Sequence, residues 1–220
     1  MIDFFAFDIV EALAEPGCAL CRVLAEFEER EMATFAREGR RVPEARSRFH
    51  ASGGFCPHHA WLLHGIVARS GKGMPIADIY GQLVEQDLER LRHARTAGPE
   101  ALARTGVCPA CTAADAALDR KADFFVDALK DAGVRSSYTD SDGFCGAHLT
   151  AALAAAREAE PRVGSFLLAD RRRRLEQLAH ELAEYDRKRD HRYAHEPKGA
   201  EQRAIADVIR LYGGSDPAQP

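Results

Sequence analysis

The chain has 220 residues, of which 46% are hydrophobic and 29% charged, with a net charge of −4 and a pI near 6.1. This composition is typical of a soluble globular protein with a hydrophobic core and excludes a disordered chain. The slightly acidic balance gives no global reason to expect nucleic acid or an anionic membrane as a partner. No window approaches ~18 uninterrupted apolar residues, so we expect no membrane span.

The amino-terminal end carries Asp3 and Asp8 where a secretory signal would carry positive charge. We therefore expect a cytoplasmic protein with reduced thiols. After Cys21, apolar residues at helical spacing predict a helix that ends near Gly39. Two more helices are predicted after His59 and from about Pro75, a residue that suits a helix start.

The second half of the chain repeats this plan. Residues 97–106, with two glycines and a proline, predict a connection between repeats. A helix is expected from Cys111 to Gly133, followed by a polar turn at 136–142 and a further helix that breaks at Pro161.

The long helix that follows Pro161 carries a leucine stripe, which predicts a face packed on another helix. The stripe consists of Leu168, Leu175, Leu178, Leu182 and Tyr185. Residues 190–197 read as an extended linker, followed by a short helix over 201–211 and a disordered end at 215–220.

No alternating run long enough for a strand occurs, so we predict an all-α fold with two pseudo-equivalent helical repeats, each with one three-cysteine, one-histidine site. The predicted domains are a first repeat over 1–97, a second over 98–190, and a carboxy-terminal linker and short helix over 191–220.

All six cysteines of the chain belong to one pattern that occurs twice, CxxC followed by GFCxxH. Equivalent positions are 90 residues apart in the CxxC pair and 89 apart in GFCxxH. The pattern comprises eight residues: Cys18, Cys21, Cys56, His59, Cys108, Cys111, Cys145 and His148. This duplication predicts two ligand sets of three cysteines and one histidine.

Three thiolates and one imidazole are a common closed, tetrahedral ligand set for zinc. In a cytosolic chain, paired cysteines indicate metal or redox chemistry rather than disulfides. A cysteine and a histidine three residues apart lie on one face of a helix's first turn, where the helix dipole favours thiolates. Gly54 and Gly143 permit a positive-φ turn, and the phenylalanine that follows each can cover the site. We therefore expect two zinc ions per chain, bound by these eight residues.

The spacing leaves open whether each CxxC pairs with its own GFCxxH or with that of the other repeat. It also leaves two other functions open: iron–sulfur clusters on the same ligands, or a CxxC dithiol oxidoreductase. A closed zinc set would be structural, so a scaffold or regulatory role with an unknown protein partner is the leading hypothesis. We find no acid–base constellation, so the expectation leans away from an enzyme. The oligomeric state is left open.

Several polar residues near the pattern have simpler interpretations. His58 aligns with Ala147 in the second copy and His64 has no counterpart, so we expect neither to be a ligand. Turn composition places Asp115, Asp140 and Asp142 in solvent. The arginines at 171–174 share a helix with several glutamates, which predicts a solvated helix face.

The tandem boxes, together with the closing residues Tyr193, Glu196–Gly199 and Arg203–Ile205, resemble an uncharacterised bacterial family that is known only as a domain of unknown function. The resemblance spans about Cys18 to Gly213. It implies a shared fold and ligand pattern, and no activity.

Overall fold

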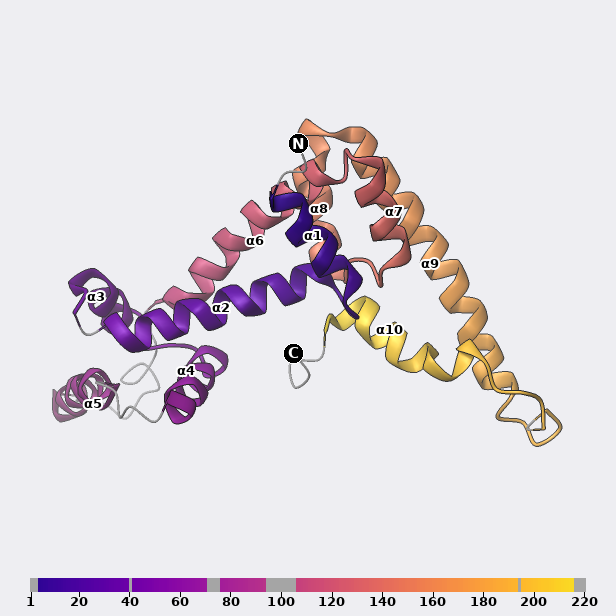
Figure 1. Ribbon diagram of the computed structural model, residues 1–220. Helices are drawn as coiled ribbons and strands as arrows, with labels where there is room; N and C mark the ends of the chain where they lie inside the picture. The colour runs from indigo at the N-terminus through magenta and orange to yellow at the C-terminus, as the bar shows by residue number, and fades with distance from the viewer. Residues whose placement is uncertain (1–3, 40, 71–75, 94–105, 194, 216–220) are drawn as a thin grey trace. The chain divides into compact units, whose positions relative to one another are not determined.

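The computed structural model describes residues 4–39, 41–70, 76–93, 106–193 and 195–215 (Figure 1). Every regular element in these ranges is a helix, which confirms the all-α prediction. The chain divides into two compact units: unit 1 contains residues 1–24 and 118–220, and unit 2 contains residues 25–117. Among the described helices, none has the length and apolar character needed to cross a membrane.

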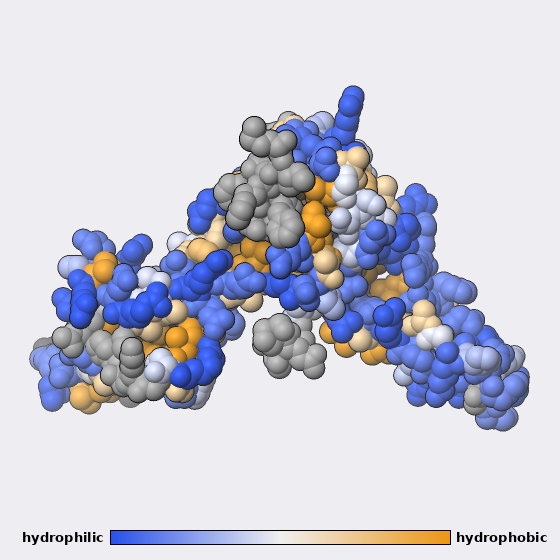
Figure 2. All heavy atoms as spheres, in the orientation of Figure 1, coloured by the Kyte–Doolittle hydropathy of each residue, from blue (hydrophilic) through white to orange (hydrophobic). Residues whose placement is uncertain are grey.

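Unit 1 is built around the helices of the second half of the chain. Its complete helices are α1 (Phe4–Ala14), α7 (Ala132–Asp140), α8 (Gly146–Ala159), α9 (Pro161–Arg187), a 3₁₀ turn (Ala200–Arg203) and α10 (Ala204–Gly213). Its main core joins Leu20 to Phe125, Leu129, Phe144 and Leu167. A smaller core holds α10 on α9 through Leu178 and Leu211. In Figure 2 the carboxy-terminal end of α9 and the segment after it are mostly hydrophilic.

Unit 2 contains α3 (Pro43–Ala51), α4 (Pro57–Ser70) and α5 (Ile76–His93). Phe49 is fully buried at its centre, and its ring centroid lies 5.6 Å from that of Phe35 and 5.1 Å from those of Phe55 and Tyr80. Aromatic pairs at this separation stabilise a core beyond the area that they bury.

Two long helices belong to both units. The helix α2 (Ala19–Glu38) passes from unit 1 into unit 2, and α6 (Pro109–Ala128) passes from unit 2 into unit 1. Each has 20 residues and begins directly after the first cysteine of a CxxC pair. At 1.5 Å per residue each helix is about 30 Å long.

The helix lengths support the predicted duplication. The two 20-residue helices α2 and α6 are each followed by a helix of 9 residues, α3 or α7, and then by one of 14 residues, α4 or α8. The compact units divide the chain differently from the repeats predicted over 1–97 and 98–190, because each unit takes parts of both repeats.

Two segments differ from the predicted secondary structure. The helix α1 was not predicted, since its apolar residues form no 3.6-residue period. The expected turn over 136–142 is wrong for its first half, where α7 runs to Asp140. The side chain of Asp131 caps this helix by accepting hydrogen bonds from the N–H groups of Gly133 and Val134 at 2.7 and 3.1 Å.

Two expectations about residues 161–197 fail in part, although Leu178 and Leu182 of the predicted stripe do pack against α10. In α9, Leu167 and Leu178 are buried, whereas Leu168 is 56% exposed and Leu175 36% exposed. The predicted stripe was read at a period of seven residues, but a single straight helix buries residues at a period of 3.6. Residues 190–193 and 195–196 form turns and bends rather than an extended linker, because Tyr193 N–H donates to the carbonyl of Asp190 and Glu196 N–H to that of Tyr193. The predicted connection up to residue 105 and the end at 216–220 lie outside the described residues.

Candidate metal centres

The eight cysteine and histidine residues of the pattern form two clusters, one in each compact unit. Cluster A, in unit 1, consists of Cys18, Cys21, Cys145 and His148. The Nδ1 atom of His148 lies 3.3 Å from the sulfur of each of the three cysteines. The sulfurs of Cys21 and Cys145 are 3.9 Å apart.

Cluster B, in unit 2, consists of Cys56, His59, Cys108 and Cys111. The Nδ1 atom of His59 lies 3.2, 3.7 and 3.5 Å from the sulfurs of Cys56, Cys108 and Cys111, respectively. The sulfurs of Cys56 and Cys111 are 3.6 Å apart.

The clusters therefore use the crossed pairing. Each set contains three cysteines and one histidine, as predicted, but its members come from both repeats. In cluster A, the CxxC pair of the first repeat meets the GFCxxH box of the second. In cluster B, the CxxC pair of the second repeat meets the GFCxxH box of the first. Residues up to 130 positions apart in the sequence are thereby in contact.

The geometry of both clusters fits a single tetrahedral ion. Four ligands at zinc-like bond lengths place two sulfurs about 3.8 Å apart and a sulfur and a nitrogen about 3.6 Å apart. The ligand atoms within each cluster all lie within 4.8 Å of one another, and the separations given above are close to the tetrahedral values. Both clusters could therefore hold a metal ion.

Each cluster lies between the amino-terminal ends of two helices. Cys18, Cys56, Cys108 and Cys145 each directly precede a helix, and the carbonyl oxygen of each accepts the first hydrogen bond of that helix. The second ligand of each pair lies three residues later, in the first turn. Two helix dipoles therefore point their positive ends at each group of sulfurs and stabilise the thiolate forms that bind metal.

Close contacts among the four members of cluster A shift their pKa values. Hydrogen bonds with Cys145 and Cys18 lower the pKa of Cys21, and hydrogen bonds with Cys145 and Cys21 raise the pKa of Cys18. Burial alone would lower the pKa of His148, but its hydrogen bonds with Cys145 and Cys21 raise the pKa to about 9. These shifts arise because the three sulfurs and the imidazole share hydrogen bonds in a partly buried site.

The loop before each GFCxxH box has the predicted backbone. Gly54 and Gly143 have φ values of 90° and 73°, a region that glycine adopts without strain. The following phenylalanines, Phe55 and Phe144, are buried, and their rings pack on other aromatic rings of the two cores. Each loop is therefore held in place by the core next to its cluster.

The carboxy-terminal end of α10 covers one side of cluster A. The hydroxyl oxygen of Ser215 lies 3.3 Å from the backbone nitrogen of Cys18, whose N–H donates to it. Gly214, at φ 89°, approaches the sulfurs so closely that an added Cβ atom would lie 3.1 Å from the sulfur of Cys21. Nothing in the sequence near Gly214 and Ser215 indicates that they contact cluster A, because this contact depends on long-range packing.

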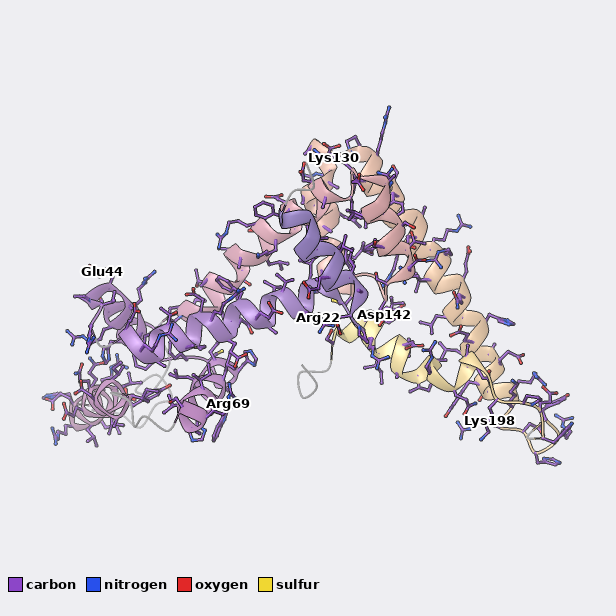
Figure 3. The ribbon with its side chains drawn as sticks, in the orientation of Figure 1. Arg22, Glu44, Arg69, Lys130, Asp142 and Lys198 are labelled. Carbon is purple, nitrogen blue, oxygen red and sulfur yellow. The ribbon has the colours of Figure 1, made fainter. Side chains whose placement is uncertain are left out.

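Asp142 is exposed, as predicted, but its carboxylate also connects two loops of cluster A. Its Oδ2 atom accepts a hydrogen bond from the N–H of Gly17 at 2.7 Å, which joins the loop before Cys145 to the loop before Cys18. Arg22, which is labelled with Asp142 in Figure 3, donates from its guanidinium to the carbonyl of Pro16, next to Gly17. Asp115 and Asp140 are exposed, as predicted.

Two arginines of the 171–174 run hold the loop of cluster A, so the prediction of a solvated face is wrong for them. Arg171 donates to the carbonyls of Phe144 and Leu211 at 3.3 and 3.1 Å. Arg174 forms an ion pair with the buried Asp170 at 2.6 Å and donates to the carbonyls that end α7. Arg172 is exposed, as expected.

Cluster B has a carboxylate next to its histidine. The Oε1 atom of Glu28 lies 3.5 Å from Nε2 of His59, a buried nitrogen with no hydrogen-bond partner, and Oε2 lies 3.1 Å from Nε2 of His58. A carboxylate in this position orients a metal-binding imidazole and fixes which nitrogen faces the metal. His58 and His64 are exposed and lie outside both clusters, but His58 forms a third group of possible metal ligands with Glu28 and His59.

The comparisons with known proteins identify the family and no activity. The chain belongs to a family of unknown function, DUF6062, whose model matches residues 3–219. This confirms the predicted resemblance to a family without an assigned function. No curated protein and no solved structure matches the chain.

Proposed function

We propose that this member of the family binds two zinc ions, one in each cluster, and that both ions are structural. The observation that carries the proposal is the convergence of three sulfurs and one imidazole nitrogen within 4.8 Å in both units. Four protein ligands close the coordination sphere of zinc and leave no position for water or substrate. The chain would then act through its helical surfaces, as a cytoplasmic scaffold or regulatory protein.

The compactness of the clusters favours a single ion over an iron–sulfur cluster. In an iron–sulfur cluster several irons and sulfides lie between the protein ligands, which must therefore spread more widely than around one ion. The sulfurs of Cys21 and Cys145, at 3.9 Å, and of Cys56 and Cys111, at 3.6 Å, are separated as around a single tetrahedral ion. A dithiol redox centre needs only two cysteines, whereas each cluster brings four donor atoms together.

Structural zinc sites contribute folding free energy directly, on the order of 10 kcal/mol in small zinc-finger peptides. In this chain the ions would join segments that are far apart in the sequence, such as Cys18 and His148. We therefore expect the metal to be required for the packing of each unit.

Elemental analysis of protein purified anaerobically from medium without added metal tests this proposal. We expect a colourless protein with two zinc ions per chain, and a large drop in melting temperature after a strong chelator has removed them. Restoring zinc is expected to restore the melting temperature. Broad visible absorption with stoichiometric iron and sulfide would contradict the proposal, as would an unchanged melting temperature after verified metal removal.

A further inference from the structure

The crossed pairing places the two halves of each repeat's ligand set in different clusters. Cys18 and Cys21 lie at the start of α2, and their own GFCxxH box follows only after this helix of about 30 Å and the nine residues of α3. A nine-residue helix is about 13 Å long, less than half the length of α2. The same helix lengths separate Cys108 from Cys145. In the structure neither repeat completes its own ligand set.

The two cores are exchanged in the same way as the ligands. In unit 1, Leu20 at the start of α2 packs with Phe125 in the last turn of α6 and with Leu129 directly after it. In unit 2, Ala110 at the start of α6 packs in one core with Met32 of α2 and Phe49 of α3. Each unit therefore buries apolar side chains from both repeats next to a cluster whose ligands also come from both repeats.

We propose, on the basis of the proposed zinc binding, that the two zinc ions are cross-links between the two repeats. Each repeat then needs both the metal and the other repeat to complete its ligand sets. One repeat alone offers two separate half-sites with two donors each, a CxxC pair and a CxxH pair. Two donors leave a zinc ion half-coordinated, so neither half-site binds tightly until the second repeat supplies the missing pair.

The proposal assigns to the metal a role that a self-contained zinc repeat would not have. In a chain with one complete site per repeat, each ion would stabilise its own repeat and the repeats could separate. With crossed ligands, removal of the ions breaks both metal links between the repeats at the same time and leaves only the packing of the two cores. The peptide link between them then becomes dispensable while the metal is bound.

Cleavage of the intact, zinc-loaded protein tests the cross-link. A recognition sequence for a specific protease is inserted between residues 97 and 98, the predicted repeat boundary, and the full chain is purified and then cut. We expect the two fragments to remain a 1:1 complex that elutes with the uncut protein and retains two zinc ions. Chelation is expected to abolish this complex, and zinc is expected to restore it from the mixed fragments.

A variant with a single cluster provides a matched control. Cys18→Ser with Cys145→Ser removes two ligands of cluster A and leaves cluster B complete. After cleavage this variant is expected to stay associated through one zinc ion, which chelation releases.

Three results would overturn the inference. Fragments that separate while each carries one zinc would show that each repeat is self-contained. Fragments that stay together equally well after chelation would show that packing rather than metal joins them. If the uncut chain contains no zinc, the proposed function fails together with the inference, and this result is distinguishable from the first two because it is seen before cleavage.

Discussion

At the scale of single residues, Gly214 has a position that no other residue could occupy without strain. Its backbone conformation, φ 89° and ψ −170°, is one that is essentially restricted to glycine and costs other residues roughly 1–3 kcal/mol. An added Cβ atom would also lie 3.1 Å from the sulfur of Cys21 and 3.7 Å from that of Cys145.

We therefore expect Gly214→Ala to lower the free energy of unfolding by about 1–3 kcal/mol and to weaken zinc binding at cluster A. Gly213→Ala is the control, because nothing lies within 4 Å of a Cβ atom at that position. Denaturant unfolding and competition with a chromophoric chelator measure the two effects. Equal stability and zinc affinity in the two variants would show that the end of α10 does not contact cluster A.

Glu28 is predicted to strengthen zinc binding at cluster B alone. Its carboxylate faces the buried Nε2 of His59, and loss of such a partner reduces metal affinity about 10–100-fold. We expect this reduction in Glu28→Ala, with cluster A unaffected. Glu29→Ala, which removes an exposed carboxylate paired with Arg69, is the control. A chelator titration that resolves the two ions measures the effect, and an unchanged affinity at cluster B would contradict the role of Glu28.

At the scale of elements, α9 holds the loop that carries Cys145. The guanidinium of Arg174 pairs with the buried Asp170 and donates to the carbonyls of Ser141 and Tyr138. Removal of this guanidinium therefore leaves the buried carboxylate and the two carbonyls with fewer partners. Charged hydrogen bonds of this kind are worth about 1.5–3 kcal/mol each. We expect Arg174→Ala to destabilise the protein by at least this amount in urea unfolding. The control is the neighbouring substitution Arg172→Ala, which removes only an exposed ion pair; similar losses in both variants would contradict the assignment.

The short 3₁₀ turn before α10 is held by the buried Glu201. Its carboxylate accepts hydrogen bonds from the N–H of Gly199 and pairs with Lys188, and these interactions lower the pKa of Glu201 to about 2. Because the pKa in the folded state is depressed, the carboxylate contributes stability above its ordinary pKa of about 4.5, and the contribution is lost as pH falls toward 2.

Glu201→Gln is therefore expected to lower the melting temperature at neutral pH, and its difference from the wild type is expected to shrink as the pH falls below about 4.5. Calorimetry at several pH values measures this difference. Glu176→Gln, at an exposed pair with Arg172, should show little effect at any pH. A difference for Glu201→Gln that grows toward low pH would have the wrong sign.

Local signals were sufficient to predict many elements of this fold. The helix after Cys21 ends at Glu38, next to the predicted stop at Gly39, and α8 ends two residues before Pro161. The ligand set could be predicted because the CxxC and GFCxxH spacing is a local property of the chain. The two positive-φ glycines were predictable for the same reason.

The features that were not predicted depend on contacts between distant segments. Nothing local to Glu28 shows that it faces His59, and nothing local to Arg171 and Arg174 distinguishes them from the exposed Arg172. The spacing alone could not reveal the crossed pairing, since 34 residues lie between Cys21 and Cys56 whichever partner each one meets. It becomes apparent only from the ligand atoms that meet in each cluster.

At the scale of the whole molecule, the central claim is that metal ligands are exchanged between the two repeats. The zinc content of two double variants tests this claim most directly, with native mass spectrometry of the intact chain as the measurement. Cys18→Ser with Cys145→Ser alters cluster A alone, so we expect one bound zinc ion. Cys18→Ser with Cys56→Ser alters one ligand in each cluster, so we expect none. The reverse result, no zinc in the first variant and one in the second, would show that each repeat completes its own site and would contradict the account.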